Sequence, residues 1–148
     1  MLKIWIMPAR FYEQEVRSGL KDKKKLSAYI DGLVTQYRKG KGKSSLTYVF
    51  CTDAYLLDIN RKFLDHDTYT DIITFDLTSE GELLTGEIYI STDRITENAL
   101  KFGNPYVEEL HRVIFHGALH LCGFKDKSAT DKKKMREMED KCLAEYFK

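Results

Sequence analysis

The segment from His116 to Asp126 constrains the fold more than any other part of the chain. Two histidines stand four residues apart in an apolar run, Gly123 follows them, and Asp126 comes six residues after the second histidine. Side chains at i and i+4 lie on one helix face about 5–6 Å apart, so both imidazoles can bind one ion. Three protein ligands leave zinc a fourth position for water, as in catalytic sites. The spacing predicts a metal-dependent hydrolase with His116, His120 and Asp126 as ligands.

The residues around the two histidines predict a buried helix. Val113–Leu121 is apolar on nearly every side, and His116 and His120 are its only polar side chains. A helix that is apolar all round is expected to be buried, and an unpaired buried imidazole costs about 1–3 kcal/mol. Gly123 can adopt a left-handed conformation that ends the helix, so the returning chain aims Asp126 at the imidazoles. Core histidines that hydrogen-bond to other groups are the alternative to a metal site.

The donor set indicates which metal and which chemistry to expect. Two imidazoles and one carboxylate suit one Zn²⁺ per chain, although other divalent transition metals accept the same set. His66 and His111 are weaker candidates, and His111 is predicted to lie on the surface because it is rotated away from the face of His116. A zinc metallopeptidase is an alternative function. It lacks its usual general base, because Gly117 stands where the His-Glu-x-x-His pattern has glutamate.

The composition is that of a soluble globular protein. The chain has 148 residues and is 43% hydrophobic and 32% charged, with no apolar stretch near the 18 residues of a membrane span. We therefore expect a single hydrolase domain over 1–148 and no membrane partner. The three cysteines are far apart and form no CxxC pair, which favours reduced thiols and a cytoplasmic location.

Charge is unevenly distributed along the chain. Residues 1–50 contain 11 Lys and Arg against 4 Asp and Glu, whereas residues 51–100 contain 3 against 11. Basic clusters occur at 21–25, 38–43 and 132–136. Each cluster alone is typical of a solvated surface, but three of them beside a hydrolytic site favour a polyanionic substrate.

Hydrophobic spacing predicts four strands in the first 91 residues, with two helices between them and three helices after the last strand. The strands are expected at 2–6, 46–51, 71–77 and 86–91, and the helices at 26–37, 53–63, 92–102, 105–121 and 128–146. Asp53, Asn104 and Ser128 are the predicted N-caps of the second, fourth and fifth helices. Strands that precede helices indicate an α+β fold with helices packed on one small sheet.

The histidine segment resembles the motif of the YbeY family of bacterial endoribonucleases, His-Gly-x-Leu-His-Leu-x-Gly-Tyr-Asp-His. The chain matches it at His116, Gly117, Leu119, His120, Leu121 and Gly123. Phe124 replaces the tyrosine, Lys125 replaces the aspartate, and Asp126 falls where the family has a third histidine ligand. A carboxylate in place of an imidazole keeps the coordination chemistry.

Two upstream segments extend the resemblance. Residues 70–75 (Thr-Asp-Ile-Ile-Thr-Phe) and 86–90 (Gly-Glu-Ile-Tyr-Ile) are similar to two strand motifs of the family. One departure is Leu64, at a position where the family usually carries arginine. Arg61, one helical turn earlier, is a candidate substitute.

The resemblance implies a fold and a function. The fold is a small mixed four-stranded sheet packed with about five helices, with a zincin-like metal site on a helix. The function is single-strand-specific, metal-dependent endoribonuclease activity in 16S ribosomal RNA 3′-end maturation and ribosome quality control, with ribosomal RNA and the ribosome or small-subunit proteins as partners. The sequence does not identify the general base, for which metal-bound hydroxide, Glu87 and Asp71 are the candidates. A non-catalytic ribosome-assembly factor with a structural metal is a further alternative.

Overall fold

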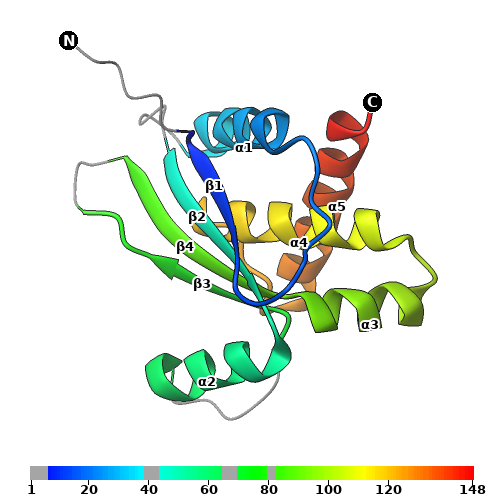
Figure 1. Cartoon of the computed structure of the whole chain (residues 1–148). Helices are drawn as coiled ribbons and strands as arrows, with labels where there is room; N and C mark the ends of the chain where they lie inside the picture. Colours follow the sequence, from blue (N-terminus) through cyan, green and yellow to red (C-terminus); the bar gives the residue numbers. More distant parts are fainter. Residues whose placement is uncertain (1–6, 39–43, 65–69, 80–82) are drawn as a thin grey trace.

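A mixed four-stranded sheet forms the centre of the molecule (Figure 1). The computed structural model describes residues 7–38, 44–64, 70–79 and 83–148. The sheet order is β1-β2-β4-β3, in which β1, β2 and β4 are parallel and β3 is antiparallel to β4. The strands are β1 (Ala9–Glu13), β2 (Ser44–Cys51), β3 (Ile72–Asp76) and β4 (Leu84–Ser91). The predicted small mixed sheet is therefore confirmed.

Five helices accompany the sheet in the described parts of the chain. They are α1 (Lys23–Tyr37), α2 (Asp53–Leu64), α3 (Thr92–Phe102), α4 (Tyr106–Leu121) and α5 (Ala129–Tyr146). The main core joins one face of the sheet to α1, α4 and α5, whereas α2 packs on the opposite face against Cys51 and Ile73. No helix in these described residues is long and apolar enough to span a membrane.

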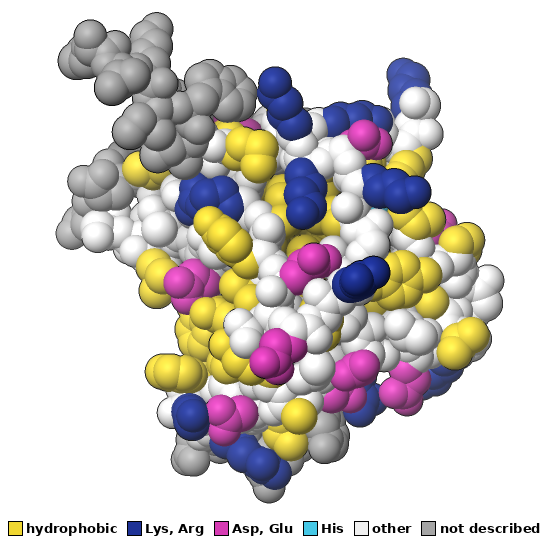
Figure 2. Space-filling view, viewed as in Figure 1, with side chains coloured by type: hydrophobic (Ala, Val, Ile, Leu, Met, Phe, Trp, Pro, Cys, Tyr) yellow, Lys and Arg dark blue, Asp and Glu magenta, His cyan; other side chains and the backbone are white. Residues whose placement is uncertain are grey.

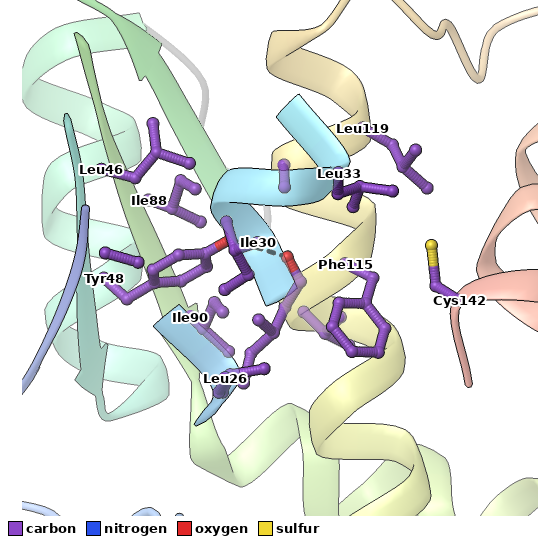
Figure 3. Packing of buried hydrophobic residues seen from close by; sticks show 14 of the residues in the cluster. Leu26, Ile30, Leu33, Leu46, Tyr48, Ile88, Ile90, Phe115, Leu119 and Cys142 are labelled. Atoms are coloured by element: carbon purple, nitrogen blue, oxygen red, sulfur yellow. Dashed lines mark hydrogen bonds between the residues drawn. The ribbon is translucent and has the colours of Figure 1, made fainter. Parts of the chain in front are cut away.

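The helix that carries the histidines packs directly on the sheet. Alternate residues of β2 and β4, among them Tyr48 and Ile88, point into the core toward α4, where a Cβ at Gly117 would lie 3.0 Å from Ile88. Phe115 and Leu119 lie on the other side of α4, toward α5 (Figure 3). The Tyr48 hydroxyl is fully buried and donates a hydrogen bond of 2.9 Å to the Ile114 carbonyl. This bond fixes α4 against the middle of the sheet.

The first strand and helix α4 begin at other residues than expected. The strand expected at 2–6 lies outside the described residues, and the first observed strand, Ala9–Glu13, was not expected. It is an edge strand in which only Ala9 is buried, so its sequence lacks a clear apolar alternation. Helix α4 begins one residue later than expected, with Pro105 rather than Asn104 as N-cap. Asn104 instead donates its N–H to the Ala99 carbonyl and completes the end of α3.

Of the other two predicted N-caps, Ser128 is confirmed and Asp53 is wrong. Ser128 and Asp131 form the predicted capping box of α5. Asp53 does not cap α2, because the Thr52 hydroxyl accepts from the Tyr55 N–H. The Asp53 carboxylate accepts hydrogen bonds from Ser91 and Arg94 instead, and so ties α2 to the start of α3.

The surface reflects the uneven charge of the sequence. Several Lys and Arg side chains gather along the edge formed by α1 (Figure 2). On the uncovered part of the outer sheet face, Arg10 donates to the hydroxyls of Ser45 and Thr47 at 2.9 and 3.0 Å.

Candidate metal centre

The three predicted ligands line one small cavity. Its volume is about 320 Å³, and its walls come from β3 and the residues before it, from α4, and from the segment after α4. The lining residues are Thr70, Asp71, Ile72, Thr74, His116, His120 and Asp126. Residues more than 40 positions apart in sequence thus meet at the end of α4.

The three side chains approach one another without forming a closed coordination shell. The rings of His116 and His120 are parallel within 7°, with centroids 6.4 Å apart. The Nε2 atom of His116 lies 3.3 Å from Oδ2 of Asp126. Among the described residues, no set of three or more His, Cys, Asp or Glu side chains already has a metal-holding arrangement. The metal site therefore stays a prediction. Whether these residues fit a metal depends on which of their atoms are free to bind it.

Both histidines are held through Nδ1. The Nδ1 of His116 lies 2.7 Å from Oε2 of Glu139, and the Nδ1 of His120 lies 3.1 Å from the Phe124 carbonyl oxygen. A carbonyl or carboxylate oxygen can only accept, and for His116 the 2.7 Å contact of Nδ1 with Glu139 is shorter than the 3.3 Å contact of Nε2 with Asp126. We therefore assign the proton of each neutral ring to Nδ1. The proton-free Nε2 is then the nitrogen that can bind a metal, as in metal-ligating histidines generally. The donor set fits a divalent transition metal.

The cavity is also electrostatically suited to a cation. Burial alone would lower the pKa of His116, but the hydrogen bond and charge of Glu139, with Asp126 and Asp71 nearby, raise that pKa above its ordinary value of 6.5. Burial raises the pKa of Asp71, and the His116 charge opposes that rise only in part. A group of carboxylates around two imidazoles favours positive charge at this position.

Of the two carboxylates considered as general base, only Asp71 lines the cavity. Glu87 accepts a hydrogen bond from the Tyr89 hydroxyl. It points to the face opposite α4, because its neighbour Gly86 faces α4, where a Cβ would lie 2.7 Å from the Leu121 side chain. Glu87 is therefore separated from the histidines by the sheet.

The C-terminal end of α4 positions both His120 and Asp126. Gly123 has φ of 106°, in the left-handed region that favours glycine, as predicted. Its N–H donates to the His120 carbonyl, and the Phe124 N–H donates to the Leu119 carbonyl. These are the two bonds of a Schellman motif, which reverses the chain. The reversal places the Phe124 carbonyl on Nδ1 of His120 and returns Asp126 to the cavity.

Gly117 has a packing role. A Cβ at this position would lie 3.0 Å from side-chain atoms of both Ile72 and Ile88. The residue after His116 therefore faces the sheet at close range and leaves no space for a glutamate. The general base of a His-Glu-x-x-His peptidase has no place in this packing.

Two predictions of histidine burial were wrong. His111, expected on the surface, is only 4% exposed and packs against Tyr146 and Phe147, with Nδ1 2.7 Å from the Val107 carbonyl. His120, expected to be buried, is exposed. The reason is that α5 covers the middle of α4 but the cavity opens at its C-terminal turn.

Sequence reasoning missed the group that supports His116. Glu139 of α5 is buried, and its Oε1 accepts a 3.1 Å bond from Arg112, which also pairs with Asp140 at 2.8 Å. A signal for Glu139 was present in the sequence, because it is a charged residue inside the apolar stripe that contains Met135, Met138 and Cys142. The stripe does not show that Glu139 contacts His116.

Comparison with known proteins gives a consistent result. The family model of Endoribonuclease YbeY matches residues 12–147. An Endoribonuclease YbeY of Parabacteroides distasonis is 42% identical over 138 residues, which cover 93% of this chain and 95% of the relative. That of Porphyromonas gingivalis is 51% identical over 106 residues, covering 72% and 70%.

A solved structure has a similar fold. The solution structure of TM1509 from Thermotoga maritima matches with a TM-score of 0.62 and 26% identity, over 94% of this chain and 89% of that one. The resemblance inferred from the histidine motif is thus confirmed, and with it the prediction of an RNA-hydrolysing enzyme class at the level of the family. The chain belongs to the Endoribonuclease YbeY family.

Proposed function

We propose that the chain is a single-domain, metal-dependent endoribonuclease that cuts single-stranded RNA in 16S ribosomal RNA 3′-end maturation and ribosome quality control. The observation that carries the proposal is the cavity in which two imidazoles, each held through Nδ1, meet Asp126. Relatives named as endoribonucleases, matched over most of the chain, support RNA as the substrate.

In this proposal His116, His120 and Asp126 hold one Zn²⁺ or another divalent transition metal. When bound, the metal supplies Lewis acidity that polarises the phosphodiester and acidifies the attacking water. The Nδ1 hydrogen bonds keep both rings oriented. Asp71 is the side chain that we propose to accept a proton, and its place in the lining of the same cavity supports this role. The basic side chains along α1 neutralise phosphates, so binding should weaken as salt rises.

The proposed setting follows from the substrate. An enzyme that matures ribosomal RNA meets its substrate on the ribosome or with small-subunit proteins, in the cytoplasm and without a membrane partner. The cysteines Cys51, Cys122 and Cys142 are all free thiols, as a reducing compartment favours.

One further candidate function has an observation in its favour. Leu64 stands at the end of α2, where the family usually carries arginine, and its side chain is 40% exposed. A chain without that positive charge could act as a ribosome-assembly factor with a structural metal. That candidate predicts ribosome association, unfolding on metal removal and no RNA cleavage. The metallopeptidase alternative is disfavoured by the packing of Gly117.

Cleavage assays test the proposal. Protein reconstituted with Zn²⁺ should cut a single-stranded RNA and leave the matched duplex intact, and a chelator or His120→Ala should abolish cutting. Because His120 is exposed, its replacement should leave the fold unchanged, which circular dichroism checks. Glu137→Gln, on the exposed face of α5, is the matched control and should keep full activity. Cutting by purified His120→Ala protein at the wild-type rate would contradict the proposal.

A further inference from the structure

Glu139 joins the candidate metal centre to a buried charge network. It belongs to α5 and is 6% exposed, yet its Oε2 lies 2.7 Å from Nδ1 of His116 on α4. Its second oxygen, Oε1, accepts the 3.1 Å bond from Arg112. Both carboxylate oxygens are therefore engaged, one by a candidate ligand and one by a guanidinium.

Arg112 is placed to hold this carboxylate in one orientation. It lies four residues before His116, so both side chains project from the same face of α4 toward α5. Its side chain is 9% exposed, and its other terminal nitrogen pairs with Asp140 at 2.8 Å. Arg112 thus spans adjacent carboxylates of α5, which fixes the rotation of Glu139 relative to the ring of His116.

Helix packing alone does not account for this arrangement. A buried ion pair is often no more stabilising than apolar side chains of similar volume, and the neighbours on α5 are Met135, Met138 and Cys142. The buried Nε of Arg112 also lacks a hydrogen-bond partner in the described parts of the chain. What the charged pair provides and an apolar pair cannot is an oriented acceptor for Nδ1 of His116.

We propose that Glu139 is a positioning residue of the metal centre: held by Arg112, it keeps the His116 proton on Nδ1 and presents Nε2 to the cavity. The value of this arrangement for metal binding rests on the proposed function, whereas the tautomer of His116 does not. An acceptor behind a ligating histidine orients the ring, and loss of such an acceptor weakens metal binding about 10–100-fold.

The first experiment reads the tautomer in metal-free protein. In ¹⁵N-labelled, chelator-stripped protein at a pH where the rings are neutral, NMR should show His116 protonated on Nδ1. Glu139→Gln retains an acceptor oxygen and should keep this tautomer, whereas Glu139→Leu should lose it. Glu137→Leu, two positions away on the exposed face of α5, should match the wild type.

A second variant covers the case in which Glu139→Leu does not fold because Arg112 is left buried and only partly paired. The double variant Arg112→Met/Glu139→Leu replaces the ion pair with apolar side chains and should fold. It should still lose the Nδ1 tautomer. An unchanged tautomer in either folded variant overturns the proposal.

The second experiment titrates stripped protein with Co²⁺ and follows the visible spectrum. Wild type and Glu137→Leu should bind with the same affinity, and the double variant should bind about 10–100-fold more weakly. Equal affinities would overturn the proposed effect of Glu139 on metal binding. No Co²⁺ binding by the wild type, together with the expected tautomer change, would instead refute the metal centre and leave the role of Glu139 in orienting His116 intact.

Discussion

His111, His116 and His120 lie on one helix, yet each meets a different environment. His111 is packed among aromatic rings, His116 is half-buried against Glu139, and His120 is exposed at the cavity. The four-residue spacing of His116 and His120 correctly predicted that their rings lie on one face of the helix. The spacing could not predict how deeply each histidine is buried. That depends on which part of α4 is covered by α5, and the residues of α4 alone do not show where α5 packs.

The burial of His111 predicts an acid-sensitive contribution to stability. Burial lowers the pKa of His111 below 6.5, which the bond to the Val107 carbonyl only partly opposes. Below pH 6.5 the unfolded chain therefore binds this proton more readily than the folded one. The contribution to the free energy of unfolding is full above pH 6.5 and falls as pH decreases toward the folded-state pKa, by at most about 1.4 kcal/mol per pH unit.

Urea unfolding of the wild type and His111→Phe checks this effect. Phenylalanine keeps an aromatic ring in the packing but cannot be protonated. Between about pH 7.5 and about pH 5.5 the variant should lose less stability than the wild type, by at most about 1.4 kcal/mol. Equal losses in both proteins would show that His111 does not titrate on unfolding in this range.

At the scale of elements, the end of α4 determines where the site lies. Gly123 was predictable as a helix terminator because glycine adopts the left-handed conformation at little cost. The Schellman motif then brings the Phe124 carbonyl oxygen to Nδ1 of His120. The sequence could not predict this contact, because every residue has a backbone carbonyl and the residue type at position 124 gives no signal.

Gly123→Ala tests the reversal. No atom lies within 4 Å of the added Cβ, so the expected destabilisation of about 1–2 kcal/mol arises from the positive φ alone. Zn²⁺ affinity should fall as well, because His120 loses its oriented acceptor. Gly32→Ala is the matched control: its Cβ also meets no atom, but it lies inside α1, where alanine should stabilise by about 0.5–1 kcal/mol. Thermal and urea unfolding measure both.

The contact between α4 and the sheet gives another prediction. Tyr48→Phe removes the buried hydroxyl that donates to the Ile114 carbonyl and should cost about 1 kcal/mol in the free energy of unfolding. Tyr12→Phe, at a side chain that is 53% exposed on the same sheet, should change it little. A Tyr48→Phe protein as stable as the wild type would show that the bond does not hold α4 in place.

At the scale of the whole molecule, the sequence indicated the fold class and most helices and strands, but not their arrangement. The pairing of β2 with β4 rather than with β3 is a long-range choice that local periodicity does not contain. The network of Arg112, Glu139 and His116 depends on the same long-range packing. The family resemblance, not periodicity, led to the expectation of a mixed sheet of four strands.

The central claim is that His116, His120 and Asp126 together bind one metal ion. The most direct test is elemental analysis of chelator-stripped protein after dialysis against Zn²⁺. The wild type and Glu137→Gln should retain about one equivalent per chain, and folded His116→Ala, His120→Ala and Asp126→Ala should retain none. One equivalent in all three folded variants would contradict the assignment of the metal centre.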